Sequence, residues 1–134
     1  MQPIKILWVE DDATKLEGMV KPLKRDGHVI FYAEDQTEAL ELLENNKFDL
    51  ILIDIIIPTG IKNDLADNHF VGIDLIKKIK EEEKISTPIM VLSVVRDNEL
   101  IKSIKKMGIE NILQKGSLLP SELKKEIYGM LNIK

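Results

Sequence analysis

Residues 48–57 have the sequence FDLILIDIII, in which residues 50–57 form an aliphatic run interrupted by one acid, Asp54. The run is far shorter than the roughly 20 apolar residues that a membrane helix needs. Short, bounded aliphatic runs are typical of strands in a parallel sheet that is covered on both faces. A carboxylate in such a strand is costly to bury unless it is paired or binds a metal. The segment therefore predicts a buried central strand with either a functional acid or a structural acid, satisfied by helix N–H groups, at position 54.

Four other short apolar runs predict the remaining strands, at residues 4–9, 29–33, 89–95 and 111–113, and the central strand is expected to span 50–57. Leucine and isoleucine repeats at helical spacing predict helices at 16–23 with a kink at Pro22, and at 35–45, 73–79, 100–107 and 120–130. Strands that alternate with helices indicate an α/β fold with a parallel sheet and right-handed crossovers. We expect one domain over residues 1–134, with an extended polar loop at about 59–71 before the third helix.

The composition excludes several classes of function. With 19 Lys and Arg against 23 Asp and Glu, the net charge is -4, so we expect no binding to nucleic acid or to an anionic membrane. The chain has no cysteine, which rules out disulfides and thiolate chemistry. The first residues do not resemble a signal peptide, and we expect a cytoplasmic protein.

Polar residues occur where the predicted strands end: Glu10, Asp11 and Asp12 after the first, Asp54 in the third, Ser93 in the fourth and Lys115 after the fifth. Ligands of open α/β sheets bind at the carboxyl ends of the strands. Asp12 could simply cap a helix, but a cap requires one acid rather than three. Carboxylates that face one another repel, and a hard divalent cation such as Mg²⁺ removes that repulsion. The sequence therefore predicts a metal site at this edge.

In these motifs the chain resembles the receiver domains of bacterial two-component response regulators. The resemblance covers nearly the whole length and rests on ILWVEDD at 6–12, FDLILID at 48–54 with Pro58 after it, PIMVLS at 88–93, and Lys115. It implies a doubly wound, flavodoxin-like fold with five helices and a five-stranded parallel sheet in the order 2-1-3-4-5.

The same resemblance implies a role for each site residue. Asp54 would accept the phosphoryl group. Mg²⁺, or Mn²⁺ in its place, would be bound by Glu10, Asp11, Asp54 and the backbone carbonyl of Ile56. Ser93 would contact a phosphoryl oxygen, and Lys115 would pair with Asp54 or its phosphate.

The implied function is signal transduction. The donor would be a phosphohistidine on a sensor histidine kinase or a histidine phosphotransfer domain. Phosphorylation would switch the face formed by the fourth helix, the fifth strand and the fifth helix, through Ser93 and Ile112. The chain would be an enzyme only in catalysing its own phosphorylation and dephosphorylation. Receiver domains often pair through this face, so a homodimer is compatible with the sequence.

Three residues depart from the family pattern. Ile112 replaces an aromatic residue, Gly116 replaces a proline with a cis bond, and Val94 replaces a small residue, which is expected to narrow access to Asp54. A non-proline cis bond costs about 2.5–4 kcal/mol, so we expect a trans bond before Gly116. These departures leave open a pseudo-receiver that binds partners without phosphorylation. A phosphatase of the haloacid-dehalogenase type is disfavoured, because Ile56 stands where that family needs a second acid.

Overall fold

The computed structural model describes residues 2–57, 71–94 and 97–134. They contain five parallel strands in the order β2-β1-β3-β4-β5. The strands are β1 Lys5–Val9, β2 Val29–Ala33, β3 Leu50–Asp54, β4 Ile89–Ser93 and β5 Asn111–Gln114. The predicted fold class and strand order are confirmed, and β2 is an edge strand as expected.

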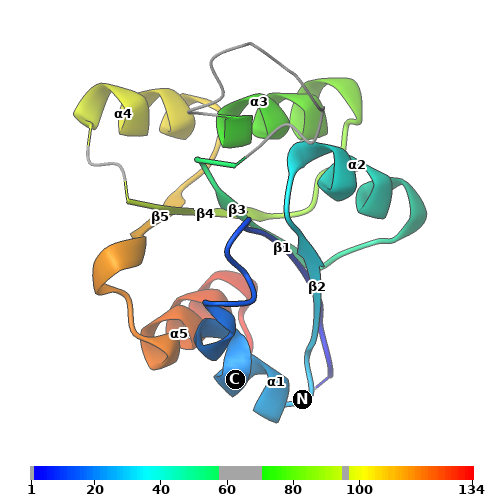
Figure 1. The fold of residues 1–134 in the computed structure, drawn as a ribbon, viewed down its shortest axis with the longest axis vertical. Coiled ribbons are helices and arrows are strands. Elements are labelled where there is room, and N and C mark those ends of the chain that lie inside the picture. The colour runs from blue at the N-terminus through cyan, green and yellow to red at the C-terminus, as the bar shows by residue number, and fades with distance from the viewer. Residues whose placement is uncertain (1, 58–70, 95–96) are drawn as a thin grey trace.

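Helices cover both faces of the sheet. They are α1 Lys21–Arg25, α2 Gln36–Asn45, α3 Val71–Lys77, α4 Asn98–Lys106 and α5 Pro120–Leu131. A π-helical turn, Lys78–Glu82, extends α3, and a 3-10 turn, Lys115–Ser117, follows β5. Figure 1 shows α2, α3 and α4 on one side of the sheet and α1 and α5 on the other. None of the described helices has the length and apolar character needed to cross a membrane.

The core is split into two layers by the sheet. Side chains alternate along each strand, so Ile51 and Ile53 of β3 pack under α2–α4, whereas Leu50 and Leu52 pack against α1 and α5. The three central strands are buried on both faces and the edge strands only partly, which explains why the central runs are almost purely aliphatic. Trp8, the chain's single tryptophan, is 1% exposed in β1 on the α1 and α5 side.

The strand predicted over 50–57 is shorter than expected and ends at Asp54. Beyond that residue the backbone groups turn to other partners. The N–H of Ile56 donates to Asp54 Oδ1 over 3.1 Å, and the carbonyl of Ile55 accepts from the N–H of Gly72 over 2.8 Å. These groups no longer join a sheet ladder, although Ile55 and Ile57 remain buried as their apolar character demands.

The first helical segment also differs from its prediction. A 3-10 turn, Glu17–Val20, precedes α1, so residues 16–23 do not form one kinked helix. Pro22 lies in the first turn of α1, where a missing N–H costs nothing, and it therefore helps to begin the helix. Asp12 does not cap a helix, the alternative considered for it, because residues 11–16 form turns and the helical residues begin at Glu17.

Other helix ends match their sequence signals. Asp35 caps α2 by accepting from the N–H of Glu38 at 2.8 Å. Gly27 and Gly108, which follow α1 and α4, have φ of 92° and 90°, a left-handed conformation that favours glycine. The peptide bond before Gly116 is trans, as expected.

The long link after β3 cannot be compared with its prediction, because 58–70 lie outside the described residues, as do Val95 and Arg96. Val71, predicted as the last residue of that loop, is instead the first residue of α3. The extent of the domain and of the extended loop remain predictions.

A chain of hydrogen bonds ties α5 to the amino end of the sheet. His28, 4% exposed, accepts from the N–H of Ile4 through Nδ1 at 3.0 Å, so its Nε2 donates to the Tyr128 hydroxyl at 2.8 Å. That hydroxyl donates to Asp26, which also pairs with Lys124 at 2.7 Å. Burial raises the pKa of Tyr128, and the hydrogen bond to Asp26 raises it further, to about 12. Tyr128 therefore stays a neutral donor at every physiological pH.

We expect Tyr128→Phe to lower the free energy of unfolding by about 1–3 kcal/mol, because it leaves Nε2 of the buried His28 without its partner. Urea denaturation measures the change. A midpoint equal to that of the wild type would mean that the network does not stabilise the fold.

Candidate functional site

The sheet brings two acids to the same level at its carboxyl edge. Glu10 directly follows β1, and its N–H donates to the carbonyl of Ala33 over 2.9 Å, which continues the ladder with β2. Asp54 is the last residue of the neighbouring β3. The register pairs Val9 with Ile53, so the residues that follow them, Glu10 and Asp54, lie side by side.

A third acid completes a cluster. One carboxylate oxygen from each of Glu10, Asp11 and Asp54 lies within 4.8 Å of the others. Glu10 and Asp54 are 0% and 5% exposed, whereas Asp11 is open to solvent. The cluster is therefore buried on the protein side and accessible through Asp11.

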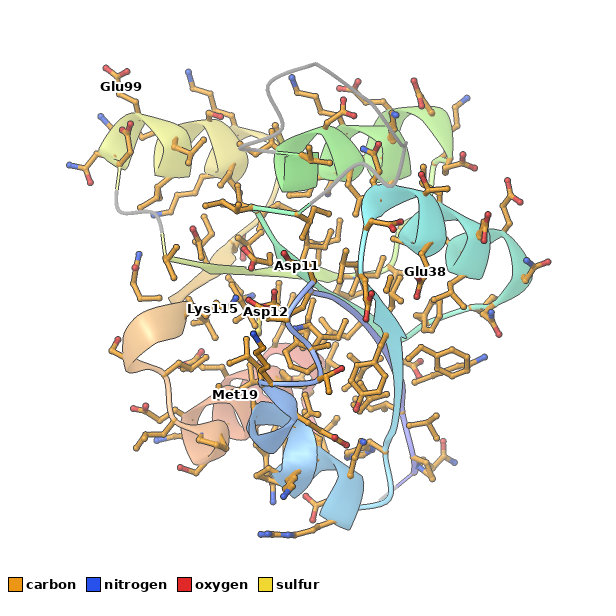
Figure 2. All side chains as sticks on the ribbon, in the orientation of Figure 1. Asp11, Asp12, Met19, Glu38, Glu99 and Lys115 are labelled. Carbon is orange, nitrogen blue, oxygen red and sulfur yellow. The ribbon has the colours of Figure 1, made fainter. Side chains whose placement is uncertain are left out.

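Lys115 reaches this cluster from the 3-10 turn that follows β5, at one side of the sheet. Its Nζ lies 2.8 Å from Asp54 Oδ2 and also forms an ion pair with Glu10 Oε1. Figure 2 shows Lys115 and Asp11 at the same edge of the sheet, although their strands are separated in the sequence by most of the chain. The ammonium thus bridges the two buried carboxylates.

The partners of Asp54 distinguish between the two roles predicted for a buried acid. Its Oδ2 pairs with Lys115, and its Oδ1 accepts from the N–H of Ile56, which belongs to no helix. Among the described residues, these contacts do not match the alternative of an acid satisfied by helix N–H groups.

The electrostatics of the cluster follow from burial and charge. Burial, reinforced by the charge of Asp54, raises the pKa of Glu10 to about 7 even though the hydrogen bond from Lys115 opposes it. Burial alone would lower the pKa of Lys115, but its hydrogen bonds to Asp54 and Glu10 outweigh that effect and raise it. Lys115 therefore stays charged. With three carboxylates beside this single ammonium, the site favours binding of a further positive charge.

The remaining predicted residues lie on β4, which is next to β3, and on β5, the edge strand beyond it. Ser93 ends β4 and is 1% exposed, one residue beyond Leu92, the register partner of Asp54. Ile112 lies within β5 rather than at the edge, and it packs against the core cluster under α2–α4. The structure thus brings Lys115 into contact with Glu10 and Asp54. Ser93 lies at the end of the adjacent strand β4, and Ile112 lies within β5, away from the carboxyl ends of the strands.

A family model described as the response regulator receiver domain matches residues 6–128. The chain belongs to this family. Residues 6–128 include every site residue named above, so the predicted resemblance is confirmed.

Individual relatives agree with this family. The receiver domain is 30% identical over 111 residues to the transcriptional regulatory protein CrdR of Helicobacter pylori, with 83% of this chain and 47% of CrdR covered. It is 29% identical over 115 residues to the sensor histidine kinase AruS of Pseudomonas aeruginosa, with 84% of this chain and 10% of AruS covered. The chain therefore spans less than half the length of either relative.

Solved structures share the fold. A CheY-like receiver domain protein from Methanospirillum hungatei matches with a TM-score of 0.79 and 23% identity, covering 98% of this chain and 95% of that one. At this identity the likeness concerns the fold, and it agrees with the sheet order described above.

The donor set of this receiver domain fits a hard divalent cation. Three carboxylates against one ammonium leave two negative charges in a largely buried site when all four groups are ionised. Carboxylate oxygens are the ligands that Mg²⁺ prefers, and one exposed ligand leaves room for the waters that this ion retains. The receiver domain therefore has a site of suitable chemistry for Mg²⁺.

Two features of the receiver-domain site go beyond the sequence prediction. Lys115 pairs with Glu10 as well as with Asp54. Gly72, which directly precedes the predicted third helix, lies against the backbone of Asp54 and Ile55. A glycine within a helical pattern costs about 1 kcal/mol relative to alanine, which is a signal that backbone or side-chain packing requires it.

Proposed function

We propose that this receiver domain acts as a phosphorylatable switch, with Asp54 as the phosphoacceptor. The observation that carries the proposal is the environment of Asp54, a buried carboxylate held between the Lys115 ammonium and an acidic pair. Among the described residues nothing favours the pseudo-receiver alternative, because the acids and the lysine meet in one site.

The reaction is a phosphoryl transfer between two side chains. A carboxylate oxygen of Asp54 attacks the phosphorus of a phosphohistidine, a P–O bond forms and the P–N bond breaks. The imidazole leaves with the electron pair of that bond and takes a proton from solvent. Lys115, already 2.8 Å from Asp54 Oδ2, stabilises charge that spreads over the phosphoryl oxygens. The product is an acyl phosphate.

The metal would be held by Glu10, Asp11, Asp54 and the backbone carbonyl of Ile56, and Mn²⁺ could take the place of Mg²⁺. When bound, the ion would supply positive charge to the transferring phosphoryl group. The protein side of the site does the positioning: the ladder to Ala33 fixes Glu10, and the N–H of Ile56 orients the Asp54 carboxylate.

The proposal is tested with acetyl phosphate as a small donor. Intact-mass analysis of the wild-type protein with MgCl₂ is expected to show a gain of about 80 daltons, one phosphoryl group. Peptide mapping should locate the group on Asp54, and hydroxylamine, which cleaves acyl phosphates, should remove it. An excess of EDTA should prevent the gain. A folded protein that gains no mass with Mg²⁺ would overturn the proposal and support a pseudo-receiver.

Magnesium should also stabilise the protein without any phosphodonor. At a concentration a hundredfold above its dissociation constant, a bound ion adds about 2.7 kcal/mol to the free energy of unfolding, which raises the unfolding temperature by several degrees. We expect Asp11→Asn to lose most of this increase, because it removes one of the three carboxylates that would bind the ion. Asp11 is the exposed member of the cluster, so its substitution perturbs the fold least. Thermal unfolding with MgCl₂ and with EDTA measures it.

Asp12→Asn is the matched control, since Asp12 is the exposed neighbour of Asp11 and is outside the cluster. It should retain the full magnesium effect. Equal losses in both variants would mean that the ion merely screens the acidic segment.

The partner we propose is a sensor histidine kinase or a histidine phosphotransfer domain. Receiver domains are phosphorylated by such kinases, and AruS, a relative of this chain, is itself named a sensor histidine kinase. Two apolar side chains beside the site, Ile56 and Val94, are 37% and 56% exposed and offer contact area to a partner. The effect of Val94 on access to Asp54 stays a prediction.

The output we propose is a change in the face formed by α4, β5 and α5, which could also pair two copies of the chain. Phosphorylation adds charge and acceptor oxygens at the strand ends, towards which the hydroxyl of Ser93 would move. Ile112 packs on the same core cluster as Leu100 and Met107 at the two ends of α4. A shift of β4 and β5 would therefore be passed to α4 by apolar packing, as a bias on two pre-existing states.

A further inference from the structure

The start of α3 lies directly on the backbone that carries the phosphoacceptor. Gly72 is the second residue of α3 and is buried. A Cβ at this position would lie 2.5 Å from the Cα of Ile55, 2.8 Å from its carbonyl oxygen, and closer still to the carbonyl oxygen of Asp54. Real Cβ atoms do not approach other atoms within 3.0 Å, so only glycine fits without movement of the backbone.

A hydrogen bond joins the two segments at this contact. The N–H of Gly72 donates to the carbonyl of Ile55 over 2.8 Å. The first N–H groups of a helix have no partner within the helix, so this bond satisfies one of them and also the first carbonyl beyond β3. The N–H of Ile56, which belongs to the same peptide unit as the Ile55 carbonyl, donates to Asp54 Oδ1. Gly72 therefore holds the peptide unit whose N–H orients the Asp54 carboxylate.

We infer that Gly72 is a positioning residue for the acidic site, an inference that rests on the proposed metal-dependent function. By lacking a side chain, it lets α3 close on residues 54 and 55. This contact fixes the Asp54 carboxylate and the Ile56 carbonyl in the directions that a shared cation needs. Any larger residue pushes the end of β3 away from Glu10 and Asp11 while leaving those two acids unchanged.

Gly72→Ala is therefore expected to weaken magnesium binding. Loss of a group that orients metal ligands typically lowers metal affinity 10–100-fold, and we expect at least about a tenfold rise in the dissociation constant. Isothermal titration with MgCl₂ should be done well below the unfolding temperature, on protein shown by circular dichroism to be folded. A purely structural role would lower stability in EDTA but leave the affinity of the folded protein unchanged.

Gly129→Ala is the matched control, because a Cβ at Gly129 in α5 would meet nothing within 4 Å. It should bind magnesium as the wild type does. Wild-type affinity in folded Gly72→Ala would overturn the inference and leave the proposed function intact. Failure of the wild type itself to bind magnesium would instead count against the proposed function.

A second measurement needs no variant and decides the matter if Gly72→Ala does not fold. Amide hydrogen exchange of the wild-type protein, followed by NMR, should slow at both Ile56 and Gly72 when MgCl₂ is added, because the ion would tighten the peptides that link them. Gly108, which follows α4 and whose N–H donates to the carbonyl of Lys105, should show no change in exchange. Slower exchange at Ile56 with no change at Gly72 would overturn the inference.

Discussion

Asp54→Asn is expected to abolish phosphorylation altogether. The amide keeps the size of the side chain and can still accept from the N–H of Ile56, but it has no carboxylate oxygen to attack phosphorus. It also removes the negative charge that pairs with Lys115. Intact-mass analysis after incubation with acetyl phosphate and MgCl₂ should therefore show the unmodified mass only.

Asp49→Asn is the control for this substitution. Asp49 lies just before the other end of β3, is exposed, and accepts from the N–H of Lys5. It should be phosphorylated like the wild type. A phosphoryl adduct that formed equally in Asp54→Asn would place the acceptor elsewhere and remove the basis of the proposed function.

Lys115→Met should have the second largest effect, on the rate of phosphorylation rather than on metal binding. Methionine retains most of the apolar length but removes the cation that contacts Asp54 and Glu10. Loss of one preorganised charge partner of a transition state typically costs about 10²–10³ in rate, and we expect a decrease of this order with acetyl phosphate. Magnesium affinity should not fall, because the ammonium competes with the ion for the same carboxylates.

This separation of rate from affinity is the informative result. Lys124→Met, which removes an ion pair between α5 and Asp26 at the end of α1, is the control and should change neither quantity. If Lys115→Met lost magnesium affinity in proportion to its rate, the lysine would act by holding the carboxylates in place, and its role as a direct charge partner would be wrong.

Sequence reasoning predicted well where one local pattern determines the structure. The aliphatic run around Asp54 specified a strand buried on both faces, and its acid had to meet a cation, as it does in Lys115. Strand ends carry the other site residues because parallel strands share one functional edge. The order β2-β1-β3-β4-β5 came from the family resemblance, since the periodicity of a strand does not state its neighbours.

The features that escaped prediction depend on tertiary contacts. Asp12 has the residue type of a helix cap, but the chain turns through residues 11–16 and delays the helix to Glu17. The role of Gly72 depends on how closely α3 approaches β3, which no spacing of apolar residues encodes. The second partner of Lys115, Glu10, follows β1, which lies three places from β5 in the sheet, so this contact requires the fold to be known.

The burial of Trp8 has a practical consequence. This indole lies in β1, two residues before Glu10, which directly follows that strand, and no other tryptophan contributes emission. Its fluorescence therefore originates from a single, water-excluded point beside the acidic cluster. We therefore expect Mg²⁺ binding and phosphorylation to change the fluorescence of the unlabelled protein, so that both can be followed without an attached dye.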